Sequence, residues 1–328
     1  MSLNAQKTLS FKTLLQAKRD IMQIVRSVTA TNAQVQDIKD FKEMPGPRVV
    51  PVLGSAWVFL PIVGRYSLQK LHLAWVDKQR LYGDVIREKF GPLEFVFSFN
   101  PEHLDVVYEN EGPYPSRGEF DTLKFYRESR PKWYKTTGVL ATQGKEWWDL
   151  RSKTQKHLMK PKAIQAYLLP MQEVAKDFVQ SIQLERDSNE EVADFLGDLY
   201  KWALESVALV GLDTRLGCLE RNLAPDSDAM KMIRSVQAQF DLMGKLEMVP
   251  LYKYFSTPNW RRYTKASDIF SEIAFRYINN ALNELKANEE HEDKELTLLQ
   301  TLLLEKGLDL SGAMVTVADM LMAGIDTG

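Results

Sequence analysis

The segment from Leu310 to Gly328, LSGAMVTVADMLMAGIDTG, constrains the fold more than any other part of the chain. Before its final four residues it carries one charged side chain, Asp319, and its apolar residues surround a helix on all sides. Such a helix is stable only where other elements cover it, so the sequence predicts a central helix of a large protein. Asp309 or Ser311 can cap its first backbone N–H groups.

The far end of this predicted helix combines small and polar residues. Ala323 and Gly324 are followed by an acid and an alcohol, Asp326 and Thr327. A pair of small residues lets a ligand approach the backbone, and a buried polar group needs a partner. From the residues alone two interpretations remain open, a core helix that reaches the surface at Asp326 or a proton-relay pair beside a bound small molecule.

The composition of the whole chain excludes several classes of protein. The 328 residues are 45% hydrophobic, enough for a large core in one big domain or two smaller ones. Lysine and arginine number 42 against 44 acidic residues, so no nucleic-acid partner is predicted. The single cysteine, Cys218, excludes an internal disulfide framework, and four scattered histidines predict no imidazole metal site.

The first 30 residues are basic and poor in acids, and serine and threonine are interspersed among them. Their charged residues are Lys7, Lys12, Lys18, Arg19 and Arg26 against Asp20. This composition predicts a mitochondrial transit peptide and linker over residues 1–40, with an ordinary basic surface helix as the alternative. No run of 18 apolar residues is present, so no membrane-spanning helix is predicted.

The rest of the chain predicts many helices and one hairpin. Val85 to Phe90 and Leu93 to Phe97 predict two strands around a Gly-Pro turn. Helical spacing occurs over Gly64–Tyr82, Glu102–Asn110, the residues from Gln143, Met171–Ile182, Val192–Leu212, Ala229–Leu246 and Ser267–Ala287. We therefore predict a mainly α architecture with a small β-sheet, in one domain over residues 41–328.

Two further segments carry candidate functional residues. Residues 112–140 are dense in proline, arginine and aromatics, and predict a long loop that either lines an apolar pocket or covers the surface. Trp147 and Arg151 lie four residues apart, so they share one face of the helix that begins near Gln143. An indole N–H beside a guanidinium suits a pair of carboxylates, although a cation–π contact at the surface would use the same residues.

Several strings together resemble one family. AGIDT at the far end of the central helix, WWDLR around Trp147 and Arg151, and YPSRGEFDTLKFYRESRPKWY are similar to the cytochrome P-450 haem-thiolate monooxygenases. The resemblance is to the mitochondrial branch, in an arthropod member, and it covers residues 41 to 327. It implies the N-terminal portion of the cytochrome P-450 fold and a monooxygenase that inserts one oxygen atom from O2 into a lipophilic, steroid-like or xenobiotic substrate.

The same resemblance implies cofactors, partners and site residues. The cofactor would be haem b, the electron donor a mitochondrial [2Fe-2S] ferredoxin, and the location the matrix side of the inner mitochondrial membrane, peripherally bound. Trp147 and Arg151 would hold the haem propionates. Ala323 and Gly324 would flank the oxygen-binding groove, and Asp326 with Thr327 would deliver protons during oxygen activation.

The chain also departs from that family. It contains no ExxR and no FxxGxRxC loop, which carries the iron-ligating cysteine, and Gly328 stands where the family has Ser or Thr. Cys218 lies outside such a loop, so we interpret it as structural and not as the iron ligand. We expect the sequence to be the N-terminal portion of a longer enzyme. The alternative is a non-catalytic homologue that binds lipid or loosely held haem.

Overall fold

The computed structural model describes residues 40–91, 93–116, 118, 120–221, 223–248, 250–287 and 297–327. The predicted transit peptide and linker, residues 1–40, lie outside the described residues apart from Asp40. The chain divides into two compact units, and the boundary falls after Asp105, inside helix α3 (Glu102–Asn110). The prediction of a single domain over residues 41–328 stays a prediction.

The N-terminal unit is built on one helix and one hairpin. Helix α2 (Leu71–Tyr82) precedes strands β1 (Val85–Phe90) and β2 (Leu93–Ser98), which pair antiparallel with Phe90 opposite Leu93. The predicted hairpin is therefore confirmed, one residue longer at its end. The helix begins later than its apolar spacing suggested, because a 3-10 turn at Leu68–Lys70, capped by Ser67, comes first.

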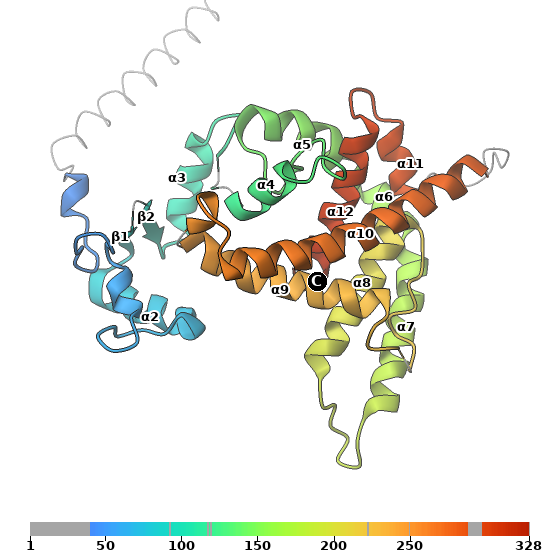
Figure 1. Cartoon of the computed structure of the whole chain (residues 1–328), viewed down its shortest axis with the longest axis horizontal. Coiled ribbons are helices and arrows are strands. Elements are labelled where there is room, and N and C mark those ends of the chain that lie inside the picture. Colours follow the sequence, from blue (N-terminus) through green and yellow to red (C-terminus); the bar gives the residue numbers. More distant parts are fainter. Residues whose placement is uncertain are drawn as a thin grey trace, which may run out of the picture. The chain divides into compact units, whose positions relative to one another are not determined.

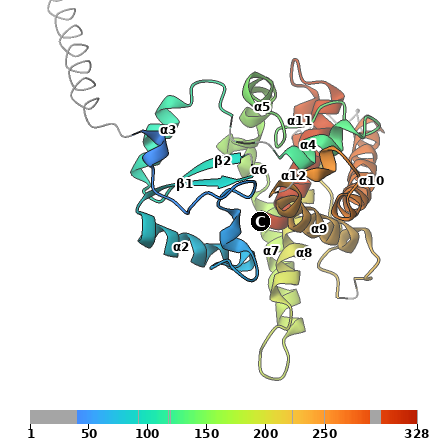
Figure 2. The ribbon, with the colours of Figure 1, turned by 60° about the vertical axis from the view of Figure 1, so that its left-hand side comes forward.

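The C-terminal unit is entirely helical over its described residues (Figures 1 and 2). Its helices are α4 (Asp121–Glu128), α5 (Gly144–Leu158), α6 (Pro161–Ala166), α7 (Leu168–Glu185), α8 (Phe195–Leu212), α9 (Asp228–Met248), α10 (Pro258–Ala287), α11 (Leu298–Leu303) and α12 (Leu310–Thr327). With the single hairpin of the other unit, they confirm the predicted fold class, mainly α with a small sheet.

Helix α12 is the central element that the apolar segment predicts. It packs against α8, α9, α10 and α11 (Figure 1). Ala313, Val315 and Leu321 have no exposed surface. The N–H of Gly312 donates to Asp309 Oδ1 over 2.7 Å, so Asp309 is the cap. By length and composition alone α12 could cross a membrane, but its burial is that of a core helix.

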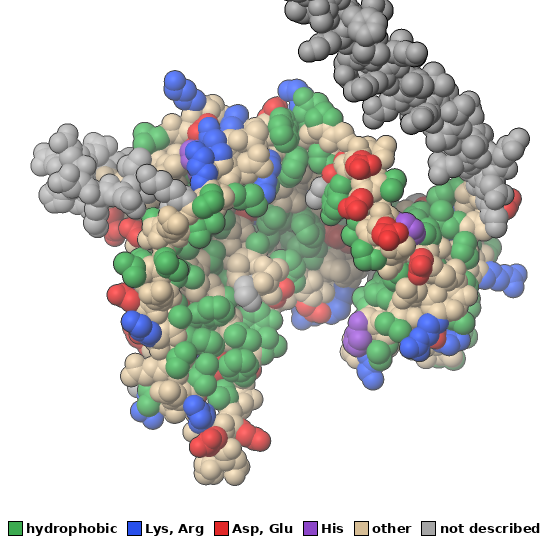
Figure 3. Space-filling model, turned by 180° about the vertical axis from the view of Figure 1, so that it is seen from behind, with side chains coloured by type: hydrophobic (Ala, Val, Ile, Leu, Met, Phe, Trp, Pro, Cys, Tyr) green, Lys and Arg blue, Asp and Glu red, His purple; other side chains and the backbone are tan. Residues whose placement is uncertain are grey.

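Helices α7 and α8 lie side by side as an antiparallel hairpin (Figures 1 and 2). Apolar side chains cover much of one face of the C-terminal unit over this hairpin (Figure 3). Leu169 at the start of α7 is 72% exposed and Leu196 at the start of α8 is 60% exposed.

Two boundaries differ from the sequence prediction. The segment over residues 112–140, which was predicted as a loop, contains helix α4, whose Leu123 and Tyr126 are buried. The helix has only eight residues and several are charged, so its amphipathic pattern was too short to recognise. Helix α10 begins at Pro258 rather than Ser267, because proline is well tolerated in a first helical turn and Trp260 and Tyr263 extend the buried face.

Candidate functional site

The far end of α12 carries four predicted site residues. Gly324 lies against α8, and a Cβ added there would come within 2.9 Å of Val207 Cγ2, so this small residue permits close helix packing. Ala323 and Asp326 are half-buried, whereas Thr327 is exposed. The Thr327 hydroxyl donates to the carbonyl oxygen of Ala323 over 2.7 Å. No hydrogen bond or ion pair in the described part of the chain engages the Asp326 carboxylate.

Helix α5 carries the other two predicted residues. Trp147 and Arg151 are both half-buried and lie one turn apart on the same face. The Trp147 ring lies 6.4 Å from that of Trp148. Arg151 Nη2 meets only the Met159 sulfur, at 3.6 Å, among the described residues.

Arg151 has no acidic partner in the part of the chain that the structure describes, which sets it apart from several other arginines. Arg127, Arg130, Arg215 and Arg276 each pair with a carboxylate of the chain. A half-buried guanidinium has strong donors that favour an ionised acceptor, and the indole N–H of Trp147 adds one more on the same face. This donor set fits the two propionate groups of haem.

No hydrogen bond, ion pair or ring contact joins these two groups of predicted residues within the described ranges. The α12 group and the α5 group stand on separate helices, and the chain between α4 and α5 connects them through an interaction that the sequence prediction missed. Arg127, at the end of α4, forms an ion pair with Asp319 in the middle of α12, with Nη2 and Oδ1 2.5 Å apart.

Both members of this ion pair are buried. The Arg127 side chain has no exposed surface and that of Asp319 is 7% exposed. Burial opposes the charge of Arg127, but attraction to Asp319 outweighs it, so the pKa of Arg127 lies above its usual value. Burial raises the pKa of Asp319 against the lowering effect of Arg127. Because arginine keeps its proton, an ionised Asp319 is the form that balances the buried charge at neutral pH.

One sequence signal could have pointed to this pair. Asp319 is the only charge in the apolar part of the central segment, and a buried carboxylate requires a cationic partner. Asp319 also precedes Asp326 by seven residues, which is two helical turns, so both lie on nearly the same face of α12. Which of the many basic residues pairs with Asp319 is a matter of tertiary structure and not of local pattern.

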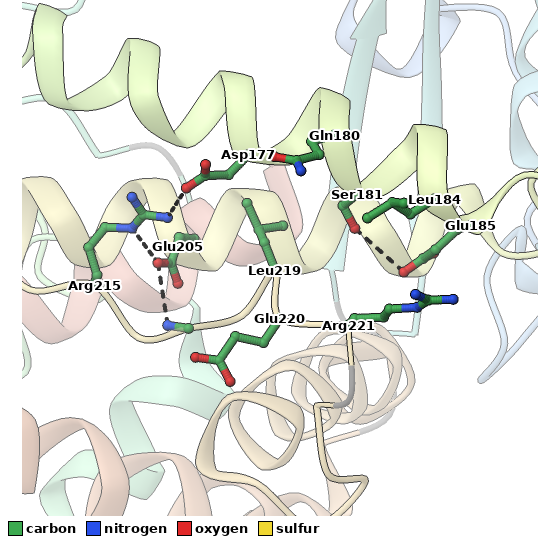
Figure 4. A pocket seen from close by; sticks show the side chains of 11 residues that line it. Asp177, Gln180, Ser181, Leu184, Glu185, Glu205, Arg215, Leu219, Glu220 and Arg221 are labelled. Carbon is green, nitrogen blue, oxygen red and sulfur yellow. Dashed lines mark hydrogen bonds and ion pairs between the residues drawn. The ribbon is translucent and has the colours of Figure 1, made fainter.

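Cys218 lies in the loop after α8 and has no exposed surface. Its N–H donates to Glu205 Oε2 over 2.9 Å. The same carboxylate accepts from Arg215, as Figure 4 shows. Burial raises the pKa of the Cys218 thiol, with the Glu205 charge acting in the same direction. These surroundings disfavour a thiolate and support the interpretation of Cys218 as structural.

The cavity drawn in Figure 4 lies between α7, α8 and this loop, with a volume of about 570 Å³. Its lining mixes both charges: Arg215 is paired with Asp177 and Glu205, while Glu185 faces Ser181. Among the described residues, His, Cys, Asp and Glu side chains form no group of three that could hold a metal ion. This polar cavity does not have the apolar character expected of a lipophilic site.

Comparison with known proteins finds a family model and several relatives for this chain. The family model of cytochrome P450 matches residues 44–328. A Drosophila melanogaster protein described as "Probable cytochrome P450 301a1, mitochondrial" is 31% identical, over 90% of this chain and 55% of that protein. Ecdysone 20-monooxygenase of the same fly is 29% identical, over 87% and 54%.

A third relative comes from the house fly, Musca domestica. Cytochrome P450 CYP12A2 of this species is 30% identical, over 92% of this chain and 57% of its own length. The chain thus spans just over half the length of these curated relatives. Several of the relatives are named as mitochondrial, in agreement with the branch that the sequence strings resemble.

Proposed function

This chain belongs to the cytochrome P450 family. We propose that it functions in a mitochondrial haem-dependent monooxygenase that acts on a lipophilic, steroid-like or xenobiotic substrate. The proposed electron donor is a [2Fe-2S] ferredoxin, and the proposed location is the matrix side of the inner mitochondrial membrane. The observation that carries the proposal is the pair of donors on α5, a half-buried guanidinium that has no carboxylate partner among the described residues, beside an indole N–H.

The first proposed role concerns binding. Trp147 Nε1 and the Arg151 guanidinium donate hydrogen bonds to the haem propionates, and the charge of Arg151 offsets one of the two carboxylates. When bound, haem supplies the iron centre at which dioxygen is activated. Cys218 is not proposed as a ligand of that iron, since its thiol is buried against Glu205.

The second proposed role concerns protons. Thr327 Oγ1 now donates to the Ala323 carbonyl, so it must turn away from the helix backbone before it can donate to a ligand. The Asp326 carboxylate is the adjacent acid and can take up a proton from solvent and return it toward Thr327 Oγ1. The small side chains of Ala323 and Gly324 leave room for a ligand beside Asp326 and Thr327. Gly324 also permits the close contact with α8.

Haem titration of the purified chain tests the binding role. Arg151→Gln should weaken haem binding about tenfold, the value of one charge-assisted hydrogen bond. Arg80→Gln is the matched control, because Arg80 is an exposed arginine of the other unit and its loss changes the net charge equally. Equal affinities for the two variants would instead favour loosely held haem on a non-catalytic homologue.

Oxygen uptake with ferredoxin, its reductase and a lipophilic substrate tests the proton role in the haem-loaded, full-length enzyme. Asp326→Asn and Thr327→Ala should lower product formation more than oxygen uptake, because the oxygen consumed would then leave as reduced oxygen species. A parallel fall of both quantities would contradict a role in proton delivery, and activity without ferredoxin would contradict the proposed electron donor.

A further inference from the structure

The chain between α4 and α5 is attached to two long helices. On one side it is held by α10. Arg130 Nε lies 2.8 Å from Asp268 Oδ1, and the hydroxyl of Tyr126 donates to the same carboxylate atom over 2.9 Å. The Tyr134 hydroxyl lies 2.8 Å from that of Ser271. These contacts fix the end of α4 and the first residues after it.

On the other side the chain is held by α12, through Arg127 and Asp319. Arg127 Nη1 also donates to the carbonyl oxygen of Thr137 over 2.6 Å, and the backbone N–H of Leu140 lies 3.5 Å from Asp319 Oδ2. The ion pair therefore contacts the turn at residues 137–142 at two points, Thr137 and Leu140. No hydrogen bond or ion pair in the described residues attaches this turn to α10.

Gly138 shows how closely the turn approaches the ion pair. Its φ is +79°, and an added Cβ would come within 2.5 Å of Asp319 Oδ2 and 2.6 Å of Arg127 Nη1. The turn is closed by its own bonds, since Thr142 Oγ1 donates to the Gly138 carbonyl over 2.9 Å. Helix α5 starts two residues later, at Gly144.

We propose that Arg127 and Asp319 are positioning residues that fix the turn at residues 137–142, and through it the start of α5 with Trp147 and Arg151, relative to the central helix α12. The proposal rests on the proposed function, because it assigns the pair to the placement of the propionate donors. The pair is not proposed to contact the cofactor. Its role is to join the two helices that carry the predicted site residues.

The connection from the turn to α5 is short, so a shift of the turn moves the start of α5. Leu140 and Trp147 are seven residues apart, and the last four of these belong to the rigid first turn of α5. Asp319 also lies two turns before Asp326 on nearly the same face of α12. The pair therefore fixes the position of the α5 donors relative to the helix that carries the proposed proton-relay residues. The two contact points, Thr137 and Leu140, both lie on the connection that leads into α5.

The test replaces both charges at once, by Arg127→Met with Asp319→Leu. Removing both charges of a buried pair leaves no charge uncompensated, so the protein should fold. The first measurement is backbone hydrogen exchange of the full chain without haem. Residues 137–147 should exchange at least tenfold faster than in the unaltered protein, whereas α9 should keep its protection.

The matched control removes two charges from the α10 attachment, by Arg130→Gln with Asp268→Asn. It should speed exchange near Tyr126 and Tyr134 but leave residues 137–147 protected. Unchanged exchange of residues 137–147 in the Arg127→Met, Asp319→Leu variant would overturn the proposal whatever haem does. If that variant fails to fold, Gly138→Ala is measured in its place, since it keeps both charges and displaces the same turn.

The second measurement compares haem with its dimethyl ester, in which both propionates are blocked. The unaltered protein should prefer free haem, and Arg151→Gln should lower this preference about tenfold. The pair variant should lower it similarly with unchanged affinity for the ester. If Arg151→Gln loses the preference for free haem over the ester but the pair variant keeps it, only the positioning role is overturned. If Arg151→Gln keeps this preference, the proposed propionate contact is overturned. The hydrogen-exchange result then decides the positioning role.

Discussion

Each unit of the molecule contains a buried ion pair, and the two pairs are built differently. In the N-terminal unit Lys78 Nζ lies 2.5 Å from Glu88 Oε1, and neither side chain is exposed. In the C-terminal unit Arg127 and Asp319 are as close and nearly as buried. The first pair joins residues 10 apart in the sequence, and the second joins residues 192 apart.

The surroundings of the two cations also differ. Lys78 Nζ lies over three aromatic rings, at 4.6 Å from the Phe59 centroid, 5.3 Å from Tyr66 and 4.4 Å from Trp75. Its only polar partner in the described residues is Glu88. Arg127 has a further acceptor in the Thr137 carbonyl besides one ring, that of Tyr134, at 4.8 Å.

Burial alone therefore does not define what an ion pair does. A compact ammonium surrounded by rings ties α2 to its neighbouring strand β1, and it can lose its proton if its partner is removed. A guanidinium cannot lose its proton, and its several donors hold a distant turn and a central helix together. The following experiments test this difference.

The largest effect is expected from Asp319→Ala. This change leaves the Arg127 guanidinium buried without its carboxylate, which costs about 5 kcal/mol, the upper range for a broken buried pair. Urea unfolding followed by tryptophan fluorescence measures the loss. In the Arg127→Met, Asp319→Leu variant most of the loss should be recovered. A double variant no more stable than Asp319→Ala would show that the uncompensated charge is not the cause.

Glu88→Gln should cost less, about 3 kcal/mol at neutral pH, because Lys78 can release its proton. Burial lowers the pKa of Lys78, and Glu88 is the group that raises it again. Without Glu88 the folded protein binds fewer protons than the unfolded chain up to the ordinary lysine pKa of about 10.4, so stability rises with pH in that window.

The pH dependence is the measurement that separates the two pairs. Urea unfolding at several pH values from 7 to 10 should show Glu88→Gln regaining stability relative to the unaltered protein. Asp319→Ala should regain none over the same range, since arginine does not titrate there. Parallel curves for the two variants would contradict the proposed difference between a lysine and an arginine at these sites.

Gly138→Ala should destabilise the protein by about 2 kcal/mol, within the range for an overpacked site. The added methyl group would collide with both charged groups of the Arg127–Asp319 pair. Gly112→Ala is the matched control, because Gly112 has a similar φ of +72° but nothing within 4 Å of an added Cβ. The difference between the two melting temperatures isolates the collision from the backbone strain, and equal shifts would argue against a tight approach.

Features that depend on local sequence pattern were predictable. The apolar segment at Leu310–Gly328 predicted a buried central helix and Asp309 as one of two possible caps, because both depend on local pattern. The hairpin followed from its Gly-Pro turn for the same reason. The sharing of one α5 face by Trp147 and Arg151 needed only their spacing of four.

Interactions across long stretches of chain were not predictable in this way. The partner of Asp319 is 192 residues away, and the sequence offers 42 basic residues. Helix α4 escaped prediction because tertiary contacts with α10 stabilise a short segment whose composition favours a loop. The packing of Gly324 on Val207 likewise depends on how α8 crosses α12, which no periodicity in either helix specifies.

The smallest effect is expected at the half-exposed pair on the same chain segment. Arg130 and Asp268 are 32% and 37% exposed, and Asp268→Asn keeps an oxygen that can accept from Tyr126. Water screens such a pair, so the loss should stay below about 1 kcal/mol and shrink further in 1 M salt. The loss in Asp319→Ala should be unaffected by salt, because no ions reach that pair. Urea unfolding at low and high salt measures both, and a salt-dependent Asp319→Ala would mean that solvent enters the turn at Gly138, which would weaken its assignment as a fixed link between α5 and α12.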